Sequence, residues 1–530
     1  MTLLSAVDPV DETPIDRYLQ LQADLTAVER FSQRHEADVL PAQQRYYRDL
    51  IPLDRPRAGQ QYAFAVDLDA CTGCKACVAA CHSLNGLDEG ESWRSVTLLA
   101  GGTAAAPFQQ TVTSACHHCV DPACLNGCPV DAYEKDPITG VVSHLDDQCI
   151  GCSYCTLTCP YEVPIFNNGR GIVRKCDMCQ GRLAAGEAPA CVQACPNEAI
   201  SIEVVDVAAA TAAAASGALV PGAPPSAITV PTTMYRSTRG RALEPSPSLM
   251  GPRRPATAHT PLAVMLVLTQ LAVGAFVTDL LWHSLLDRGA ASAMQRFDAV
   301  VAAAAGVVAL GASVLHLGRP RYCYRAVIGL RHSWLSREVV AFGAFTGLAV
   351  SYALTVWLDG PVDRRVVGAL GVMVAVCGVA GVACSVMIYA TTHRSSWRAV
   401  TVWWKFALTA ALCGLGTVMW ASTLSARSIG RSALVTLAVL MVMKLIVEAA
   451  ASRHQTRLLF SPDLRRTTMR RLASGLAGGV VVPLVLAATT LADGHTTWLG
   501  GLGVTLAFVL IVGGELLERS LFFTAASPPR

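Results

Sequence analysis

The sequence predicts an α+β domain rich in cysteine, followed by an all-α polytopic membrane domain of eight helices. Two observations carry this prediction. The 125 residues from Cys71 to Cys195 hold 16 of the 20 cysteines in the chain. Beyond about residue 258 the sequence is strongly apolar, and it contains eight stretches that each approach the roughly 20 residues needed to span a bilayer. A chain of 530 residues is long enough for two to four structural units.

The cysteines fall into four groups of four with related spacing. Groups one and three have the spacing C-x2-C-x2-C-x3-C of bacterial ferredoxins. Group two widens the middle gap to four residues and group four widens it to eleven, and a proline follows the last cysteine of groups two, three and four. The groups are Cys71, Cys74, Cys77 and Cys81; Cys116, Cys119, Cys124 and Cys128; Cys149, Cys152, Cys155 and Cys159; and Cys176, Cys179, Cys191 and Cys195.

This spacing has a chemical explanation. A tight C-x2-C-x2-C loop wraps three thiolates around one face of an iron–sulfur cubane, and the fourth cysteine leads to a neighbouring cluster, so the groups work in pairs. Structural zinc sites use pairs of C-x2-C that close tetrahedrally. Disulfide frameworks suit small secreted chains, whereas the first residues of this chain show no export signal. We therefore expect four [4Fe–4S] clusters as cofactors.

Short strands are predicted around the cysteine groups. Residues 62–66 alternate apolar with small or polar side chains, as in a half-buried strand. Val141 and Val142 precede group three, and Ile200 and Ile202 follow group four. The order of strand, cluster loop, short helix and strand is that of a ferredoxin unit, and it occurs twice, so we expect a double-ferredoxin-like fold.

The composition divides the chain into four predicted segments. They are an N-terminal helical extension (1–60), a four-cluster domain (61–206), an extended linker or tail (207–258) and the membrane domain (259–530). Residues 13–40 read as one amphipathic helix, which either packs on its own domain or docks on a partner subunit. The linker is rich in Ala, Pro, Ser and Thr, a composition that argues against a packed core.

Eight successive apolar stretches predict a multi-pass protein of the cell (inner) membrane. A single stretch could be a buried helix of a soluble protein, but eight joined by short basic loops could not. The loops on the side of the cysteine-rich domain hold 20 arginines and the other loops hold six, which predicts a cytoplasmic cysteine-rich domain. Arginines that contact a docked partner would give the same asymmetry. The predicted spans are 261–283, 297–317, 338–358, 366–390, 402–425, 432–452, 473–492 and 498–517.

A quinone site is predicted where the second span ends. His316 lies there on the cysteine-rich side, and a neutral imidazole could bond a quinone carbonyl and exchange its proton near physiological pH. The alternative is an interfacial histidine that anchors a helix end. Candidate wall residues are Arg319, Trp334, Arg337 and Glu338. No haem is expected, because the seven histidines of this half all lie at or near helix ends.

Three further ionisable residues fall within the predicted spans: Asp279, Lys444 and Glu448. Intramembrane ionisable groups are functional candidates. Lys444 and Glu448 are four residues apart on one helical face, however, so they could simply pair with each other. No basic patch with interleaved aromatic residues is present, so a nucleic-acid partner is not expected.

Both halves of the chain resemble subunits of one known family. Residues 62–237 resemble the four-cluster iron–sulfur subunit of the dimethyl sulfoxide reductase family of molybdoenzymes. Residues 260–530 resemble that family's eight-helix, quinone-reactive membrane anchor, through HLGRP at 316–320 and SWLSRE at 333–338. Two subunits that are normally separate form one chain here, and the arginine-rich HLGRP loop is more similar to the anchors of sulfite-oxidising relatives. Some members carry tryptophan at one second-group cysteine and hold a three-iron cluster, whereas this chain has Cys119 there.

The resemblance implies a nested pairing of the cysteine groups. Crossed ligation of two-cluster ferredoxins supplies the principle, and the nesting of the groups is taken from the family. The implied ligand sets are Cys71, Cys74, Cys77 with Cys195; Cys176, Cys179, Cys191 with Cys81; Cys116, Cys119, Cys124 with Cys159; and Cys149, Cys152, Cys155 with Cys128.

The function expected from these features is electron transfer between the quinone pool and a separate molybdopterin catalytic subunit. The chain has no room for a molybdopterin domain, so it is not expected to be an enzyme alone. A polyferredoxin joined to a proton-translocating quinone anchor is the alternative, and it would favour several buried ionisable groups across the bilayer. An iron–sulfur sensor that gates a transporter would favour broken helix pairs in two halves, a pattern that the sequence does not show.

Overall fold

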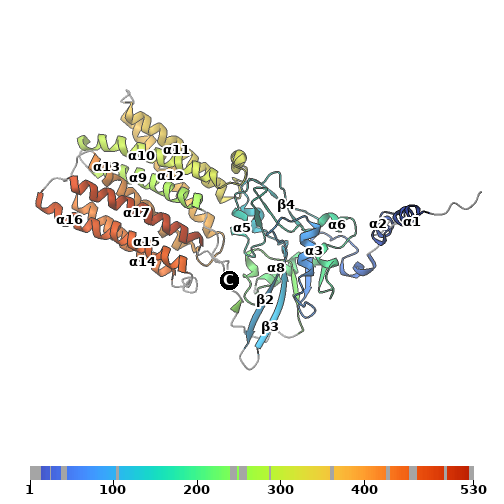
Figure 1. The fold of residues 1–530 in the computed structure, drawn as a ribbon. Helices are drawn as coiled ribbons and strands as arrows, with labels where there is room; N and C mark the ends of the chain where they lie inside the picture. Colours follow the sequence, from blue (N-terminus) through green and yellow to red (C-terminus); the bar gives the residue numbers. More distant parts are fainter. Residues whose placement is uncertain are drawn as a thin grey trace, which may run out of the picture.

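The computed structural model contains two bodies side by side, a helical bundle and a cysteine-rich α+β domain, with two N-terminal helices leading away from the latter (Figure 1). It describes residues 13–23, 26–37, 44–102, 107–215, 217–238, 248–249, 260–285, 288–358, 363–424, 430–452, 462–493 and 498–524. The predicted fold class is therefore confirmed: a ferredoxin-like domain precedes eight long apolar helices.

The N-terminal extension contains two helices where the sequence predicted one. They are α1 (Pro14–Ala23) and α2 (Ala27–Ala37). Each begins after a threonine that exchanges hydrogen bonds with an acidic residue three positions later, Thr13 with Asp16 and Thr26 with Glu29. These reciprocal bonds are capping boxes, and the second one starts a new helix within the range predicted as continuous.

The main sheet of the cysteine-rich domain is built around β1 (Gln60–Asp67). It pairs antiparallel with β8 (Ile200–Asp206) and parallel with β9 (Met234–Arg236). The prediction of a half-buried strand is wrong for β1, because Ala63 and Phe64, on opposite faces, are both buried.

Short strands and helices make up the rest of this domain, in keeping with the two predicted ferredoxin units. The remaining strands are β2 (Ser95–Gly102), β3 (Pro107–Ser114), β4 (Tyr133–Lys135), β5 (Val142–His144), β6 (Ile165–Asn167), β7 (Ile172–Arg174) and β10 (Ser248–Leu249). The helices are α3 (Ala76–Leu84), α4 (Ala123–Gly127), α5 (Tyr154–Thr158), α6 (Gln180–Ala184), α7 (Ala190–Gln193) and α8 (Val207–Ala214). Short 3₁₀ turns lie at Gln44–Tyr46, Arg48–Leu50 and Ser226–Ile228.

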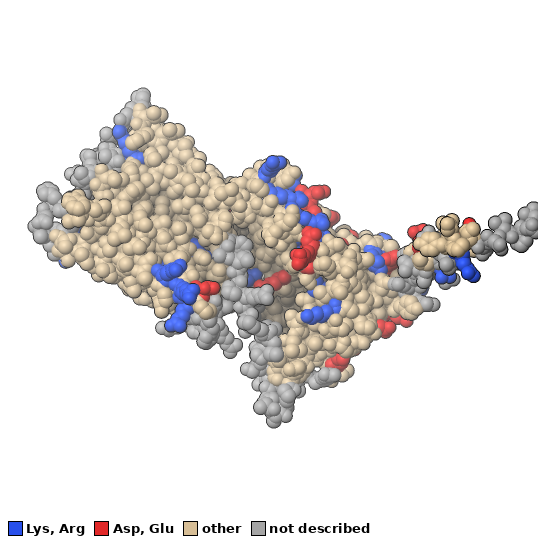
Figure 2. Space-filling model, in the orientation of Figure 1, with Lys and Arg blue, Asp and Glu red and all other residues tan. Residues whose placement is uncertain are grey.

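The helical half contains eight helices long and apolar enough to cross a membrane, as predicted, among the described residues. Its face in Figure 2 is almost free of charged side chains, whereas charges gather near the junction and on the cysteine-rich domain. The helices are α9 (Thr260–Leu285), α10 (Arg288–Leu315), α11 (Trp334–Trp357), α12 (Arg364–Ala390), α13 (Ala399–Leu424), α14 (Arg431–Ser452), α15 (Pro462–Leu476) continued by a π-turn (Ala477–Val481) and α16 (Val482–Asp493), and α17 (Trp498–Thr524).

Three helices begin well before the predicted spans, and one of them is α10, which starts at Arg288 rather than at residue 297. The third helix starts at Trp334, after Ser333, rather than at residue 338. The seventh span starts at Pro462 rather than at residue 473, because arginines read as a loop lie within α15. Arg471, counted with the surface arginines, is 1% exposed, and Arg519, counted with the C-terminus, is fully buried in α17. Neither of these two belongs in a comparison of loop charge.

The three intramembrane ionisable groups found in the sequence have more neighbours than expected. Lys444 Nζ lies 3.9 Å from Glu448 Oε1, so the predicted pair exists, but it belongs to a larger group of charges. Asp279 is buried, and the equally buried Asp298 of the next helix lies against it. The sequence reading did not single out Asp298.

Candidate metal centres

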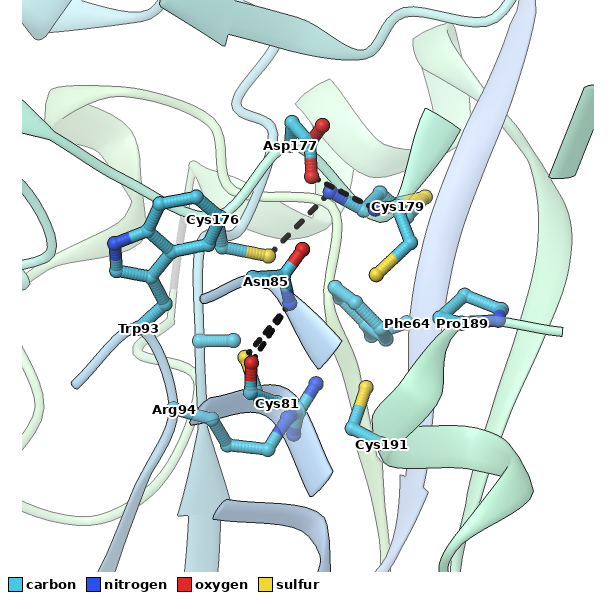
Figure 3. A pocket seen from close by; sticks show the side chains of 12 residues that line it. Phe64, Cys81, Asn85, Trp93, Arg94, Cys176, Asp177, Cys179, Pro189 and Cys191 are labelled. Atoms are coloured by element: carbon cyan, nitrogen blue, oxygen red, sulfur yellow. Dashed lines mark hydrogen bonds between the residues drawn. The ribbon is translucent and has the colours of Figure 1, made fainter. Parts of the chain in front are cut away.

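The structure gathers the sixteen cysteines into four sets, and each set takes three cysteines from one group and one from another. The sets of sites A, B and C each line a small cavity. In site B the four sulfurs point towards a common space (Figure 3). The sets are Cys71, Cys74, Cys77, Cys195 (site A); Cys81, Cys176, Cys179, Cys191 (site B); Cys116, Cys119, Cys124, Cys159 (site C); and Cys128, Cys149, Cys152, Cys155 (site D).

One backbone feature recurs in all four groups. The residue immediately before the second cysteine adopts a left-handed conformation, which turns the loop so that the first three sulfurs face the same side. Two of these residues are glycines, which adopt that conformation without steric cost, and two carry side chains. They are Gly73 (φ 74°), His118 (φ 40°), Gly151 (φ 71°) and Met178 (φ 61°).

A second feature follows the C-P pairs. An acidic residue three positions after the cysteine is left-handed in each case, namely Asp131, Glu162 and Glu198. The turn brings the next backbone N–H towards the cysteine sulfur: Ala132 N lies 3.3 Å from Cys128 Sγ, and Ala199 N lies 3.3 Å from Cys195 Sγ. An N–H aimed at sulfur stabilises a thiolate and is one of the means by which proteins tune iron–sulfur clusters.

The chemistry of these sets fits iron–sulfur clusters. Burial raises the pKa of Cys81 to about 12 and those of Cys128 and Cys159 to about 11, so the bare thiols would stay protonated at neutral pH. A bound metal deprotonates a coordinating thiol outright and replaces the missing charge partner. Four sulfurs around a cavity, with N–H groups aimed at them, are therefore arranged as cluster ligands.

Buried polar side chains lie between successive sites. Arg94 lies between site A and site B, near Cys77 and Cys191, and stacks over the Phe64 ring at 4.7 Å. Burial alone would lower the pKa of Arg94, but the nearby cysteine sulfurs, once ionised, outweigh burial and raise this pKa, so the guanidinium stays charged. Lys175 lies between site B and site C. The sites therefore follow one another in the order A, B, C.

Lys175 is the buried cation closest to a cysteine sulfur in these contacts. It is 3% exposed, its Nζ lies 3.7 Å from Cys116 Sγ, and it donates to the carbonyls of Cys176 and Val142. Between sites C and D the neutral Tyr133 is buried near Cys124 and Cys155. The sequence did not predict these three side chains between the sites, Arg94, Lys175 and Tyr133. The position of Lys175 directly before a cysteine was the one available sign that it lies near a cluster site.

Site D adjoins the membrane half. Gly318 N donates to Gly151 O at 3.2 Å, and Gly329 N donates to Pro129 O at 2.9 Å. Gly151 lies within the site D loop and Pro129 follows its fourth cysteine, so the loop between α10 and α11 holds both parts of the site. A Cβ on Gly318 would lie 2.1 Å from Gly171 O, so this close backbone contact requires glycine.

Tyr154 also links site D to the helices. It lies between Cys152 and Cys155, and its hydroxyl donates to Ile388 O of α12 at 2.8 Å. Its ring is buried in the hydrophobic core of the membrane half. The carboxylate of Glu338, which accepts a hydrogen bond from Ser385, lies near Tyr154. Tyr154 thus occupies the path between a cysteine site and a predicted quinone-site residue.

Two of the five predicted quinone-site residues, His316 and Glu338, carry groups that can exchange a proton. The other three, Arg319, Trp334 and Arg337, are held in contacts with other parts of the protein. His316 Nδ1 bonds to the Ser313 carbonyl one turn earlier, which leaves Nε2 as the acceptor nitrogen of the neutral ring, and Glu338 is 2% exposed. Arg319 instead donates to Asp146 O of the cysteine-rich domain at 2.8 Å. Arg337 stacks on Trp334 at 4.4 Å and donates to carbonyls of its own loop, at Leu330 and Arg331.

Comparison with known proteins gives two matches to family models. Residues 256–524 match the DMSO reductase anchor subunit (DmsC), and residues 108–205 match a 4Fe-4S dicluster domain. The protein belongs to the dimethyl sulfoxide reductase family. The resemblance stated from the motifs is therefore confirmed, and the protein is an iron–sulfur electron-transfer protein with its own membrane anchor.

Three relatives show how far the similarity extends. The protein is 38% identical to the B subunit of the anaerobic dimethyl sulfoxide reductase of Escherichia coli K12 over 154 residues, which are 28% of this chain and 75% of the relative. It is 39% identical to the thiosulfate reductase electron transfer subunit PhsB of Salmonella typhi over 149 residues, 28% of this chain and 77% of the relative. It is also 35% identical to the hydrogenase-2 operon protein HybA of Escherichia coli O157:H7 over 173 residues, 28% of this chain and 53% of the relative.

Proposed function

We propose that this chain carries electrons between a membrane quinone and a separate molybdopterin-containing catalytic subunit, through four [4Fe–4S] clusters held at sites A to D. Membership of the family supports both the association with a catalytic subunit and the role of the helices as a membrane anchor. The observation that carries the proposal is that the four-cysteine sets follow one another in single file, in the order D, C, B, A. Site D lies beside the membrane helices. When bound, the clusters supply one-electron redox steps.

The residues of this chain have separable tasks in that reaction. Cysteines of two groups hold each cluster, the N–H groups and buried cations set its electrostatic surroundings, and the contact of Gly318 with Gly151 fixes site D at the membrane surface. His316, with Nδ1 committed to a carbonyl, presents Nε2 to accept a proton from a quinol hydroxyl. Glu338 offers a second proton acceptor near the path from the helices to site D.

Site A is proposed as the contact point of the catalytic subunit. Cys74 is exposed, and the site lies at the opposite end of the file from the membrane helices. The direction of electron flow depends on the catalytic subunit. A sulfoxide reductase-like subunit would take electrons from the quinone through sites D to A, and a sulfite dehydrogenase-like subunit would supply electrons to the quinone through sites A to D.

Replacement of His316 by Ala tests the quinone site. The variant should keep its clusters and their reduction by dithionite while losing quinol-dependent cluster reduction, followed by absorbance or EPR in membranes. His393→Asn is a matched control, because His393 is an exposed histidine near a helix end on the same side of the bundle. Wild-type quinol reduction in His316→Ala would place the site elsewhere.

We also propose that the cysteine-rich domain faces the cytoplasm. The excess of arginines in the loops on that side supports this orientation. Arg319, Arg325 and Arg394, however, donate to carbonyls of the cysteine-rich domain, and these contacts also account for their presence on that side. Protease digestion of oriented vesicles decides between the two sides. Cleavage within residues 1–250 from the cytoplasmic side is expected, and protection there would reverse the topology.

A further inference from the structure

Seven charged side chains meet inside the membrane half, on helices other than those of His316 and Glu338. We refer to them as the ion cluster. Helix α13 contributes one, α14 two, α15 one and α17 three. They are Lys405, Lys444, Glu448, Arg471, Glu515, Glu518 and Arg519.

Lys444 and Glu515 form the centre of the ion cluster. Lys444 Nζ lies 3.2 Å from Glu515 Oε2, and it donates to Thr409 Oγ1 at 2.7 Å and to the Lys405 carbonyl at 2.6 Å. Glu515 also accepts from Arg471 Nη2 at 2.7 Å. Glu515 therefore has a strong cationic partner besides Lys444.

The outer members of the ion cluster are paired as well. Arg471 binds both oxygens of Glu448, at 2.8 and 3.2 Å. Glu518 Oε1 lies 3.0 Å from Lys405 Nζ, and Glu518 Oε2 accepts from Arg519. Each carboxylate therefore has a cation other than Lys444 in contact, and Arg471, Lys405 and Arg519 suffice to balance all three.

The charge count singles out Lys444. Four cations face three carboxylates, and a net charge in a bilayer is costly. Arginine does not lose its proton in proteins, whereas buried lysine does so readily. Lys405 keeps 13% of its side chain exposed, whereas Lys444 is fully buried. Removal of one proton from Lys444 would leave three cations and three carboxylates.

Unpartnered polar atoms lie around the ion cluster. Arg471 Nη1, Arg519 Nε, Glu518 Oε1 and Gln270 Nε2 are buried and have no hydrogen-bond partner within the described structure. Such atoms in natural proteins bond to internal water when the site is polar. Water bonded to these four atoms, around one group of charges, would give protons a hydrated route.

We propose that Lys444 is a proton-exchange site, at which the buried ammonium releases one proton to internal water and takes one back from the cysteine-rich side of the membrane. The route runs past Lys405 and Glu448, the two partly exposed members, at 13% and 15% exposure of their side chains. Lys405 lies six residues into α13, about 9 Å from the helix start. The step is a proton transfer between amine and water, and no electrons are involved.

The groups around Lys444 are those that set this exchange. On α17 they are Glu515, Glu518 and Arg519, and on α14 Glu448. Arg471 of α15 shares Glu515 with Lys444, and α13 adds Lys405 and the buried thiol of Cys413. The site is separate from the proposed electron path, so it is testable without quinone or catalytic subunit.

Nitrogen NMR of the full chain in lipid, labelled with ¹⁵N at lysine Nζ, tests the proposal because ammonium and neutral amine give distinct signals. The chain has only five lysines, which makes assignment by substitution practical. An Nζ signal is expected to become neutral before those of exposed lysines, whose ordinary pKa is roughly 10.4. That signal should be lost in Lys444→Met and retained in Lys405→Met, the matched variant of the other intramembrane lysine.

Two further variants keep the test decisive. Lys444→Met leaves the ion cluster neutral and should accumulate in membranes, whereas Lys444→Arg fixes the extra charge and should lose the titrating signal as well. If either variant fails to assemble, the other still removes the amine. Five ammonium signals that persist to pH 10, or a neutral signal that disappears only in Lys405→Met, would overturn the proposal.

Discussion

Replacement of Lys175 by Met should lower the reduction potentials of the clusters at sites B and C. The ammonium is buried, 3.7 Å from Cys116 Sγ, and adjoins Cys176. An electron added to either cluster is attracted by this charge, which stabilises the reduced form. Methionine has a similar length without the charge, so the substitution removes the attraction with little change in volume.

The structure sets the size of the effect. With the added electron about 6 Å from Nζ and an effective dielectric constant of about 20, the attraction is about 3 kcal/mol. A one-electron couple changes by roughly 59 mV for each tenfold change in equilibrium constant, so the expected shift is on the order of 100 mV downwards.

EPR-monitored redox titration of the membrane-bound protein measures the shift. Lys175→Arg keeps the charge and should retain potentials close to wild type. Lys75→Met removes an exposed lysine next to Cys74, where solvent screens the charge, and should shift the potential of site A much less. Unchanged potentials in a Lys175→Met protein that retains all its clusters would refute the electrostatic reasoning.

Three other substitutions test the arrangement of the sites. Cys81→Ser should remove the cluster at site B and spare the one at site A, seen by iron content and EPR; loss at site A instead would reverse the crossed pairing. Gly318→Ala places a Cβ 2.1 Å from Gly171 O and should destabilise the junction by about 1–3 kcal/mol, measured as earlier thermal loss of quinol-dependent reduction, while Gly311→Ala, with open space around it, should not. Tyr154→Phe removes the bond to α12 and should cost about 1 kcal/mol of stability in the same assay; no change would assign the hydroxyl no structural role.

The cysteine pattern made the first half of the protein predictable. Each cysteine group fixes a loop by itself, because the spacing alone determines which sulfurs can face one side. The flanking residues were less predictable. Lys175 directly precedes Cys176, but the local pattern does not show that it also approaches site C, and nothing in the pattern places Arg94 between sites A and B.

The ion cluster shows where sequence reasoning about membrane helices stops. A helix end is read from its charges, so Arg471 and Arg519 were counted as surface arginines, and the spans next to them were drawn short or ended early. Both arginines are buried because Glu448, Glu515 and Glu518 on neighbouring turns and helices pair with them. A hydropathy score is calculated for each segment separately. It therefore cannot detect these ion pairs, which form between helices far apart in the sequence.

The spacers between the sites are not electrically alike, and this bears on how electrons are distributed along the file. Cations lie in the gap between A and B and in the gap between B and C, at Arg94 and Lys175, whereas the gap between C and D holds the neutral Tyr133. Both cations adjoin site B, so a cluster held there would gain most from these two charges, whereas the cation near site D is Arg319, beside Cys149. If electrons enter at site D, as the proposed flow from quinone to a reductase-like subunit requires, Arg94 and Lys175 would favour their transfer towards site B. This bias favours rapid removal of electrons from the membrane surface, which would help to prevent their return to the quinone.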